Sequence, residues 1–416
     1  MKQSKDIIFW FILVFFTIIA SWGIPSLVKK ATISPDNYPF VYYSSMLKQL
    51  CLIDYKNKEF PMTDIDGNTY SVAQFDSLMP LLNFRQLMTN GTLPDSIDGH
   101  EITPQKLRIK NVVYKFTPSD IQTPDIGLYI MYESMPKRVG LKSPGDVFRI
   151  KDKIEFIDIE TNTTNHEKSK HFQEAMLKED FTFPAQWCVG DMNPRKPYDE
   201  GYFILDAKNL LFHVKMVNNR PFVRNTGVGE QIDIERLFTA SPADKRFYGF
   251  ILDKFGQTYI VGNNEGKYLL QALDVPTINS KEDELTIMGN LLYWTVSITT
   301  PSEKSAFGLE ANSLERLDEI LLDRKENKWD VVSRFLFPFY IDLKIKQSDY
   351  IQPRVYFTSH CALIVNLILA IISCFFVQGS KNRKVIFSIY IAITGVAGMI
   401  ALLALINFYK HKINKQ

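Results

Sequence analysis

The sequence contains few cysteines, and none are spaced as a reactive dithiol. Only four occur among 416 residues, and without a CxxC motif neither a redox dithiol nor a zinc knuckle is indicated. Cys361 and Cys374 fall in an apolar segment near the end of the chain. Cys51 and Cys188 lie in its central part, where they either pair in an oxidising compartment or remain free and buried.

Signature motifs of common enzymes are also missing. The chain has no GxSxG, no HExxH and no Ser-x-x-Lys with supporting partners. The stretch "GNNEGKY" at 262–268 is one residue short of a phosphate-binding loop and lacks Ser or Thr after its lysine. The sequence therefore indicates no cofactor, and it favours a non-enzymatic role without deciding the question.

Metal ligands do not occur at useful spacings. The stretch "DIDGNTY" at 64–70 places its glycine fourth, whereas a calcium loop of the EF-hand type requires it sixth. His166 and His171 are five residues apart, which puts them on different faces of a helix. We predict no metal site.

Charge is absent from three long apolar stretches, 7–28, 355–377 and 385–408. Each holds enough residues to cross a bilayer as a helix, so we predict one N-terminal and two C-terminal transmembrane helices. Without Asp, Glu, Lys or Arg inside a span, an ion or proton pathway has no obvious carrier. Asn366 is the one strongly polar side chain near mid-span, and it either hydrogen-bonds a neighbouring helix or lines a substrate route.

The remaining charge is unevenly distributed. Of 48 basic and 46 acidic residues, eleven basic and one acidic lie outside 31–350, so this stretch holds 37 basic and 45 acidic residues, a net charge of −8. An acidic domain is a poor partner for nucleic acid. We predict a tail and anchor at 1–30, an acidic domain at 31–350, and a membrane hairpin with a basic tail at 351–416.

Topology follows less directly, because basic residues flank the spans on both sides in similar number. A short N-terminal tail with two lysines is normally retained in the cytoplasm, and long domains cross a membrane largely regardless of their charge. We therefore predict a three-span protein of the cytoplasmic membrane with its large domain on the periplasmic side.

A repeat runs through the central domain. Phe203-Ile204-Leu205-Asp206 recurs 47 residues later as Phe250-Ile251-Leu252-Asp253, and the apolar pattern continues to match beyond both copies. Each copy alternates apolar residues on either side of turn-forming Asp, Asn and Gly, which is typical of consecutive hairpins.

Looser copies occur near Asp64, Asn111, Asp158 and Asn290, so the chain is expected to contain five or six units of 40–50 residues. That period is typical of a β-propeller. The fold class predicted is mainly β, a propeller-like domain flanked by membrane helices, with an irregular all-β domain as the alternative. Two helices, at 76–91 and 312–325, are expected to interrupt the strands.

The segment 183–202, "FPAQWCVGDMNPRKPYDEGY", is dense in aromatic, proline and charged residues. Trp187, Arg195 and Lys196 form a candidate ligand or partner contact on a rigid loop. The alternative interpretation is an ordered connection between repeats, held by pairing of arginine with a carboxylate.

Four segments carry a family resemblance: "NYPFVYYSS" (37–45), "FDSLMPLLNFRQLMTNGTLPDSIDG" (75–99), "GDVFRI" (145–150) and "NPRKPYDEGYF" (193–203). They resemble a family of bacterial membrane proteins catalogued as domain of unknown function 4857, and the similarity covers most of the chain. The resemblance transfers no activity and no catalytic residue. It implies a bacterial protein associated with ATP-driven transporter subunits.

Two functions remain open at this point. The first is a membrane-anchored, extracytoplasmic accessory, sensing or scaffold subunit whose partners are other integral-membrane proteins, including transporter components. The second is a membrane-anchored envelope hydrolase or lyase, with acid and base roles drawn from Asp199, Glu200, Asp206 and Asp253.

Overall fold

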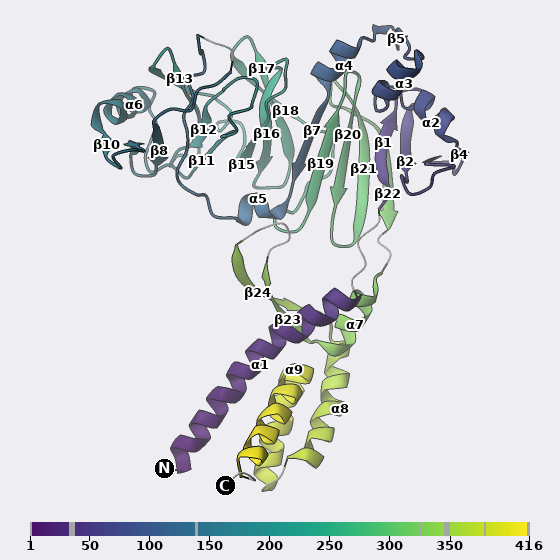
Figure 1. Cartoon of the computed structure of the whole chain (residues 1–416), viewed down its shortest axis with the longest axis vertical. Helices are drawn as coiled ribbons and strands as arrows, with labels where there is room; N and C mark the ends of the chain where they lie inside the picture. Colours follow the sequence, from purple (N-terminus) through teal and green to yellow (C-terminus); the bar gives the residue numbers. More distant parts are fainter. Residues whose placement is uncertain are drawn as a thin grey trace. The chain divides into compact units, whose positions relative to one another are not determined.

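The computed structural model describes residues 2–32, 38–137, 140–323, 326–344, 350–377 and 380–413 (Figure 1). The chain forms two compact units. One is the β-rich unit, 38–323. The other, the helical unit, combines the two ends of the chain, up to 37 and from 324. The expected domain boundary at 350 thus differs from the observed division, which assigns the segment after Asp323 to the helical unit.

The β-rich unit is built from antiparallel sheets, each assembled mostly from strands consecutive in the chain. The sheets are β1–β4 (Phe40–Ser44, Gln49–Ile53, Met62–Asp64, Thr69–Tyr70), β8–β10 (Asp146–Ile150, Ile154–Asp158, Thr164–Asn165), β11–β14 (Trp187–Gly190, Tyr202–Leu205, Leu211–Val217, Arg220–Asn225), β15–β18 (Ile234–Thr239, Phe247–Asp253, Thr258–Asn264, Lys267–Ala272) and β19–β22 (Glu284–Gly289, Tyr293–Thr299, Glu303–Glu310, Arg316–Asp323). A short ribbon pairs β5 (Ser96–Ile97) with β6 (His100–Glu101).

One strand breaks this sequential rule. β7 (Val112–Phe116) pairs with β19 and becomes the fifth strand of the β19–β22 sheet, although it precedes three other sheets in the chain.

The 47-residue repeat is confirmed as a structural repeat. Its first copy forms β12, β13 and β14, and its second forms β16, β17 and β18. The strand registers agree under the same shift, since Ile204 pairs with Phe212 just as Ile251 pairs with Tyr259. The alternating apolar pattern thus fixed both strand order and register.

The sheets follow one another across the β-rich unit, and neighbouring sheets share apolar cores (Figure 1). Phe148 of β8 meets Tyr202 of β12 edge to face at 4.9 Å between ring centroids. Phe250 of β16 similarly contacts Trp294 of β20 at 6.1 Å. The β1–β4 sheet completes the series, where Tyr43 of β1 packs on Tyr293 at 4.8 Å.

The short helices of this unit are α2 (Val72–Leu78), α3 (Phe84–Asn90), α4 (Pro104–Lys110), α5 (Pro118–Gln122) and α6 (His166–Lys178). The helix expected at 76–91 is therefore two helices, separated at residues 79–83. Its expected stop at Gly91 is correct, because Gly91 caps α3 in the left-handed region with φ 67°.

The helix expected at 312–325 is wrong. Residues Arg316–Asp323 form strand β22, which pairs with β21 along its length. Its side chains alternate between half-buried and exposed, as expected for an edge strand. Asn111, taken as a further turn of the repeat, instead ends helix α4.

Asp64 and its counterparts form the same hairpin turn in three sheets. In each turn the Asp amide donates to the carbonyl four residues on, and the amide of that residue donates back to Asp Oδ1 at 2.8 Å; the three pairs are Asp64 with Asn68, Asp206 with Leu210, and Asp253 with Gln257. The stretch "DIDGNTY" at 64–70 is therefore similar to "DKFGQTY" at 253–259 because both form this turn.

The helical unit contains α1 (Lys2–Thr32), α7 (Lys328–Leu336), β23 (Phe339–Lys344), β24 (Ile351–Phe357), α8 (Cys361–Phe376) and α9 (Lys381–Ile413). Within α1 and α9, Ile7–Thr32 and Lys381–Ile406 are long and apolar enough to cross a membrane. The apolar segment expected to start at 355 is a helix only from Cys361, because residues 351–357 pair with β23 instead. With 16 residues α8 is shorter than a typical span.

Two equivalent turn glycines, Gly67 and Gly256, have different surroundings, and this difference can be tested. Gly67 and Gly256 both have φ 87°, so alanine at either position carries the cost of a left-handed conformation, roughly 1–2 kcal/mol. A side chain on Gly67 would meet open space, whereas one on Gly256 would collide with the Ile278 backbone. We expect Gly256→Ala to lower the free energy of unfolding clearly more than Gly67→Ala, measured by denaturant titration of the full chain. An equal decrease in the free energy of unfolding for both variants would show that the Ile278 backbone does not crowd Gly256.

Candidate functional site

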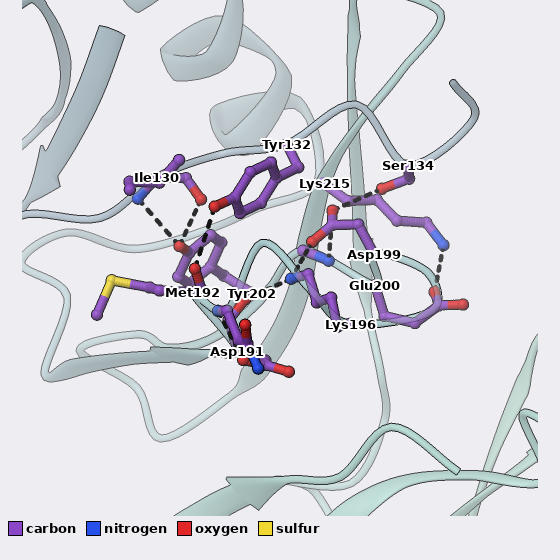
Figure 2. Close-up of polar contacts among 12 residues, drawn as sticks. Ile130, Tyr132, Ser134, Asp191, Met192, Lys196, Asp199, Glu200, Tyr202 and Lys215 are labelled. Carbon is purple, nitrogen blue, oxygen red and sulfur yellow. Dashed lines mark hydrogen bonds and ion pairs between the residues drawn. The ribbon is translucent and has the colours of Figure 1, made fainter. Parts of the chain in front are cut away.

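The loop between β11 and β12, residues 191–201, carries a polar network that includes several of the predicted site residues (Figure 2). Its first half is a pair of side-chain-capped turns: Asp191 Oδ1 accepts from the Asn193 amide at 2.8 Å, and Asn193 Oδ1 accepts from the Arg195 amide at 2.9 Å. Arg195 stays exposed, while the next residue, Lys196, is buried.

Lys196 and Asp199 form a buried ion pair. Lys196 Nζ lies 2.5 Å from Asp199 Oδ1, and both side chains are at most 3% exposed. The ammonium group also donates to the Asp191 carbonyl and lies 5.0 Å from the centre of the Tyr132 ring. Asp199 Oδ2 accepts from Ser134 Oγ and from the Gly201 amide, each at 3.0 Å. Both charges are therefore compensated, as buried charges must be.

This network fastens a distant segment, 130–134, to the sheet. Tyr132 donates its hydroxyl to the Met192 carbonyl at 3.1 Å, and Tyr202 donates to the Ile130 carbonyl at 2.6 Å, as Figure 2 shows. Ser134 supplies the third attachment through Asp199. The charged loop is thus a connection point for two stretches of chain.

Glu200 is next to Asp199 in the chain, but its carboxylate pairs with a lysine of strand β13. Its carboxylate is 2.6 Å from Lys215 Nζ on β13 and 3.9 Å from Lys245 Nζ. Its main-chain carbonyl accepts from Nε2 of His213, which is fully buried between sheets. His213 occupies the position that Ile260 has in the second copy of the repeat.

The protonation of His213 follows from its partners. Since the Glu200 carbonyl can only accept, Nε2 carries the proton, and Nδ1 accepts from the Tyr268 hydroxyl at 2.8 Å. Burial lowers the pKa of His213 to about 3, and the nearby Lys215 charge acts in the same direction. The imidazole is stacked on Phe203 at 4.4 Å between centroids. It is therefore a neutral structural group at physiological pH.

The predicted contact residues do not converge. Trp187 starts β11, half-buried, with the Arg236 guanidinium 5.6 Å from its ring centre. Arg236 in turn pairs with Asp125 at 2.6 Å. The connection expected to be held by an arginine–carboxylate pair is held by Lys196 instead, because Arg195 points to solvent.

The four candidate acids are each engaged in the fold. Asp206 and Asp253 are almost fully buried and cap hairpin turns in two different sheets. Asp199 is paired with Lys196, and Glu200 with Lys215. The structure brings Asp199 and Glu200 together with Lys196, and it leaves the two turn acids apart from them. Tyr132, Ser134 and His213, which sequence reasoning missed, complete the network.

Possible metal ligands and the two cysteines of the β-rich unit are distributed as follows. Within the described ranges, no three His, Cys, Asp or Glu side chains are grouped so that they could hold a metal ion. Cys51 on β2 and Cys188 on β11 are both free and buried in different sheets. Burial raises the pKa of Cys51 to about 12, so its thiol stays protonated and inert.

Asn366 occupies the contact between α8 and α9. Its side chain is fully buried, and Nδ2 donates to the Ala392 carbonyl at 3.1 Å. Close by, Gly395 departs from helical geometry with φ 59° and ψ −138°, and any side chain on Gly395 would overlap the Asn366 amide. The expected hydrogen bond to a neighbouring helix is thus present, at a kink in α9.

The ion pair gives a direct prediction. Lys196→Met leaves the Asp199 carboxylate buried without its cation, so we expect the free energy of unfolding to fall by about 3–5 kcal/mol. Arg195→Met, one residue earlier on the exposed side, is the matched control and should change it by less than about 0.5 kcal/mol. Denaturant titration of both full-length variants measures the difference. Similar effects would show that the pair does not hold the loop.

The buried imidazole predicts a pH dependence. Because the pKa of His213 in the folded state is about 3, below its ordinary value of 6.5, the unfolded state binds the extra proton first. Stability should therefore fall as pH drops from 6.5 toward 3, by up to about 1.4 kcal/mol per pH unit from this residue. We expect His213→Gln to lose this component of the slope and Tyr268→Phe to retain it, measured by unfolding titrations at several pH values. An unchanged slope in His213→Gln would contradict the assignment.

Comparisons with known proteins bear on the β-rich unit. A comparison with curated proteins finds no match. Among solved structures, a match is found to the "Dihydro-heme d1 dehydrogenase NirN in complex with DHE", with 11% sequence identity, a TM-score of 0.17, and coverage of 68% of this chain and 72% of the other. At that TM-score the likeness carries no argument about fold or function. Residues 40–309 match the family described as "Domain of unknown function (DUF4857)", which agrees with the segments of resemblance in the sequence. Since the match covers well over half of the chain, the protein belongs to this family.

Proposed function

We propose that the protein is a membrane-anchored accessory, sensing or scaffold subunit of a membrane complex, with its β-rich unit outside the cytoplasm. The observation that carries the proposal is the distribution of side chains on the long helices. Many large apolar side chains point outward, while several polar ones are buried between the helices. A soluble helical bundle has the opposite arrangement, so these helices suit a surrounding hydrocarbon phase.

The outward side chains come from all three apolar helices and are 64–83% exposed; they are Phe11, Ile364, Ile371, Phe375 and Ile393. The inward polar side chains are at most 5% exposed; they are Thr17, Ser21, Asn366 and Ser373. Two of these groups bond across helices: Thr17 Oγ1 lies 2.6 Å from the Tyr390 hydroxyl, and Asn366 donates to the Ala392 carbonyl. Such interhelical hydrogen bonds are typical of membrane bundles.

A cluster at the C-terminal end of α1 supports a membrane boundary there. Lys29 Nζ lies 3.2 Å from Asp342 of β23 and 5.9 Å from the ring centres of Trp329 and Tyr340. Tryptophan, tyrosine and lysine are enriched where helices leave the hydrocarbon core. β24 continues from this cluster toward α8, whose side chains again face outward.

The localisation we propose is the bacterial cytoplasmic membrane, with three spans and a periplasmic β-rich unit. The first residues of α1, with Lys2 and Lys5, and the first residues of α9, with Lys381 and Arg383, would then lie inside. The family resemblance supports partners among integral-membrane proteins, including subunits of an ATP-driven transporter. An enzymatic role as envelope hydrolase or lyase has less support, because Asp199, Glu200, Asp206 and Asp253 are each committed to pairs or turns.

We further propose that the β-rich unit is a propeller-like array. Consecutive antiparallel sheets, a shared hairpin turn and the equal registers of two copies support this assignment. In this proposal each sheet of three to five strands among the described residues counts as one unit, which gives five units.

Cross-linking in native membranes tests the proposed role. A leucine analogue with a photoreactive diazirine at Leu367, which is 59% exposed on α8, should form an adduct with a second integral-membrane protein, identified by mass spectrometry. The same analogue at Leu402, which is 1% exposed on α9, is the matched control and should react only within the chain. Adducts with lipid alone at Leu367 would argue against a subunit role.

A further inference from the structure

A cavity lies where α3 and α4 meet, far along the chain from the charged loop at 191–201. It has a volume of about 500 Å³ and is lined by Leu82, Asn83, Phe84, Arg85, Gln86, Arg108 and Asn111. This volume falls within the range of about 300–1,000 Å³ that small-molecule sites occupy. The cavity is therefore large enough for a small organic ligand.

The frame around the cavity is held by an apolar cluster of its own. Phe84 of α3 and Leu107 of α4 pack together with Ile97 of β5, all at most 6% exposed. The residues just after these two, Arg85 and Arg108, carry exposed side chains. The two guanidinium groups are thus presented from two different helices fixed by one core.

The lining is rich in donors and contains no acid. It holds two guanidinium groups and three side-chain amides, those of Asn83, Gln86 and Asn111. The nearby carboxylate of Asp76 is not part of the lining, and it accepts a hydrogen bond from the Asn83 NH₂ group at 3.1 Å. Within the described residues neither Arg85 nor Arg108 forms an ion pair. Four other arginines of this unit do form one: Arg149, Arg236, Arg246 and Arg316.

We propose that this cavity binds an organic anion whose carboxylate or phosphate group lies between Arg85 and Arg108. Guanidinium groups match the planar or tetrahedral oxygens of these anions with paired hydrogen bonds. Leu82 and Phe84 offer an apolar wall for the rest of the ligand. The domain as a whole is acidic, so the two guanidinium groups supply the local positive charge that an anion needs for binding. The proposal is independent of the membrane role proposed above.

Calorimetric titration of the full chain in neutral phosphatidylcholine nanodiscs, with phenyl phosphate as the probe, tests the site. We expect saturable binding that weakens as salt rises from about 50 to about 300 mM, because exposed charges are screened. Inorganic phosphate, which lacks an apolar part, should bind more weakly. The double variant R85Q/R108Q should bind phenyl phosphate at least tenfold more weakly. Q86E, which places a carboxylate in the cavity, should weaken binding as well.

R220Q is the matched control, because Arg220 is an exposed arginine on β14, outside the cavity lining. It should bind as the wild type does. Thermal unfolding of every variant should stay within a few degrees of the wild type, since the changed side chains are exposed. Failure of the wild type to bind, or binding unaffected by R85Q/R108Q, would overturn the proposal.

A second arm identifies the source of the anion. Nanodiscs that contain phosphatidylglycerol weaken phenyl phosphate binding if lipid headgroups occupy the cavity, and they leave it unchanged if the site serves a free organic anion. Either outcome supports the cavity as an anion site and names its source.

Discussion

The architecture depends on one constraint, the burial of strands on both of their faces. All seven residues of β16 are buried, and so are all four of β12. Such a strand cannot lie at a water-facing surface, so each of these sheets needs a neighbour on either side. The β-rich unit satisfies this requirement by adding sheet to sheet, and the helices α6 and α2 cover the sheets at the two ends of the series (Figure 1). Phe172 of α6 packs on the β8–β10 sheet, and Phe75 of α2 packs beside the β1–β4 sheet.

Sequence patterns predicted this part of the fold well where the information is local. A 47-residue spacing between Asp206 and Asp253 was enough to locate equivalent turns and, with alternating apolar residues, to fix equivalent registers. The same kind of pattern failed at 312–325. Leu314, Leu317 and Leu321 have helical spacing, yet Leu317 and Leu321 are about half exposed, because pairing with β21 decided the conformation. A tertiary partner overrode the local signal.

The candidate sites show the same limit more sharply. Lys196 and Asp199 are three residues apart, so their presence in one charged loop was visible. Their partner Ser134 comes from a segment about 60 residues earlier that has no motif of its own. His213 could have been found, because a polar residue stands where the other copy of the repeat has Ile260. Arg85 and Arg108 could not, since their convergence depends on how two short helices pack on one apolar cluster.

The pairing of β7 with β19 has a consequence for the order of assembly. The strands β8 to β18 are all synthesised between these two partners, so β7 cannot pair fully with β19 until the chain has passed residue 289. The sheets in between have mostly local pairings and can form while synthesis continues. Pairing of β7 with β19 then joins the two ends of the stretch of chain that contains these sheets. We therefore expect β7 to pair with β19 late in folding, after the sheets formed by β8 to β18.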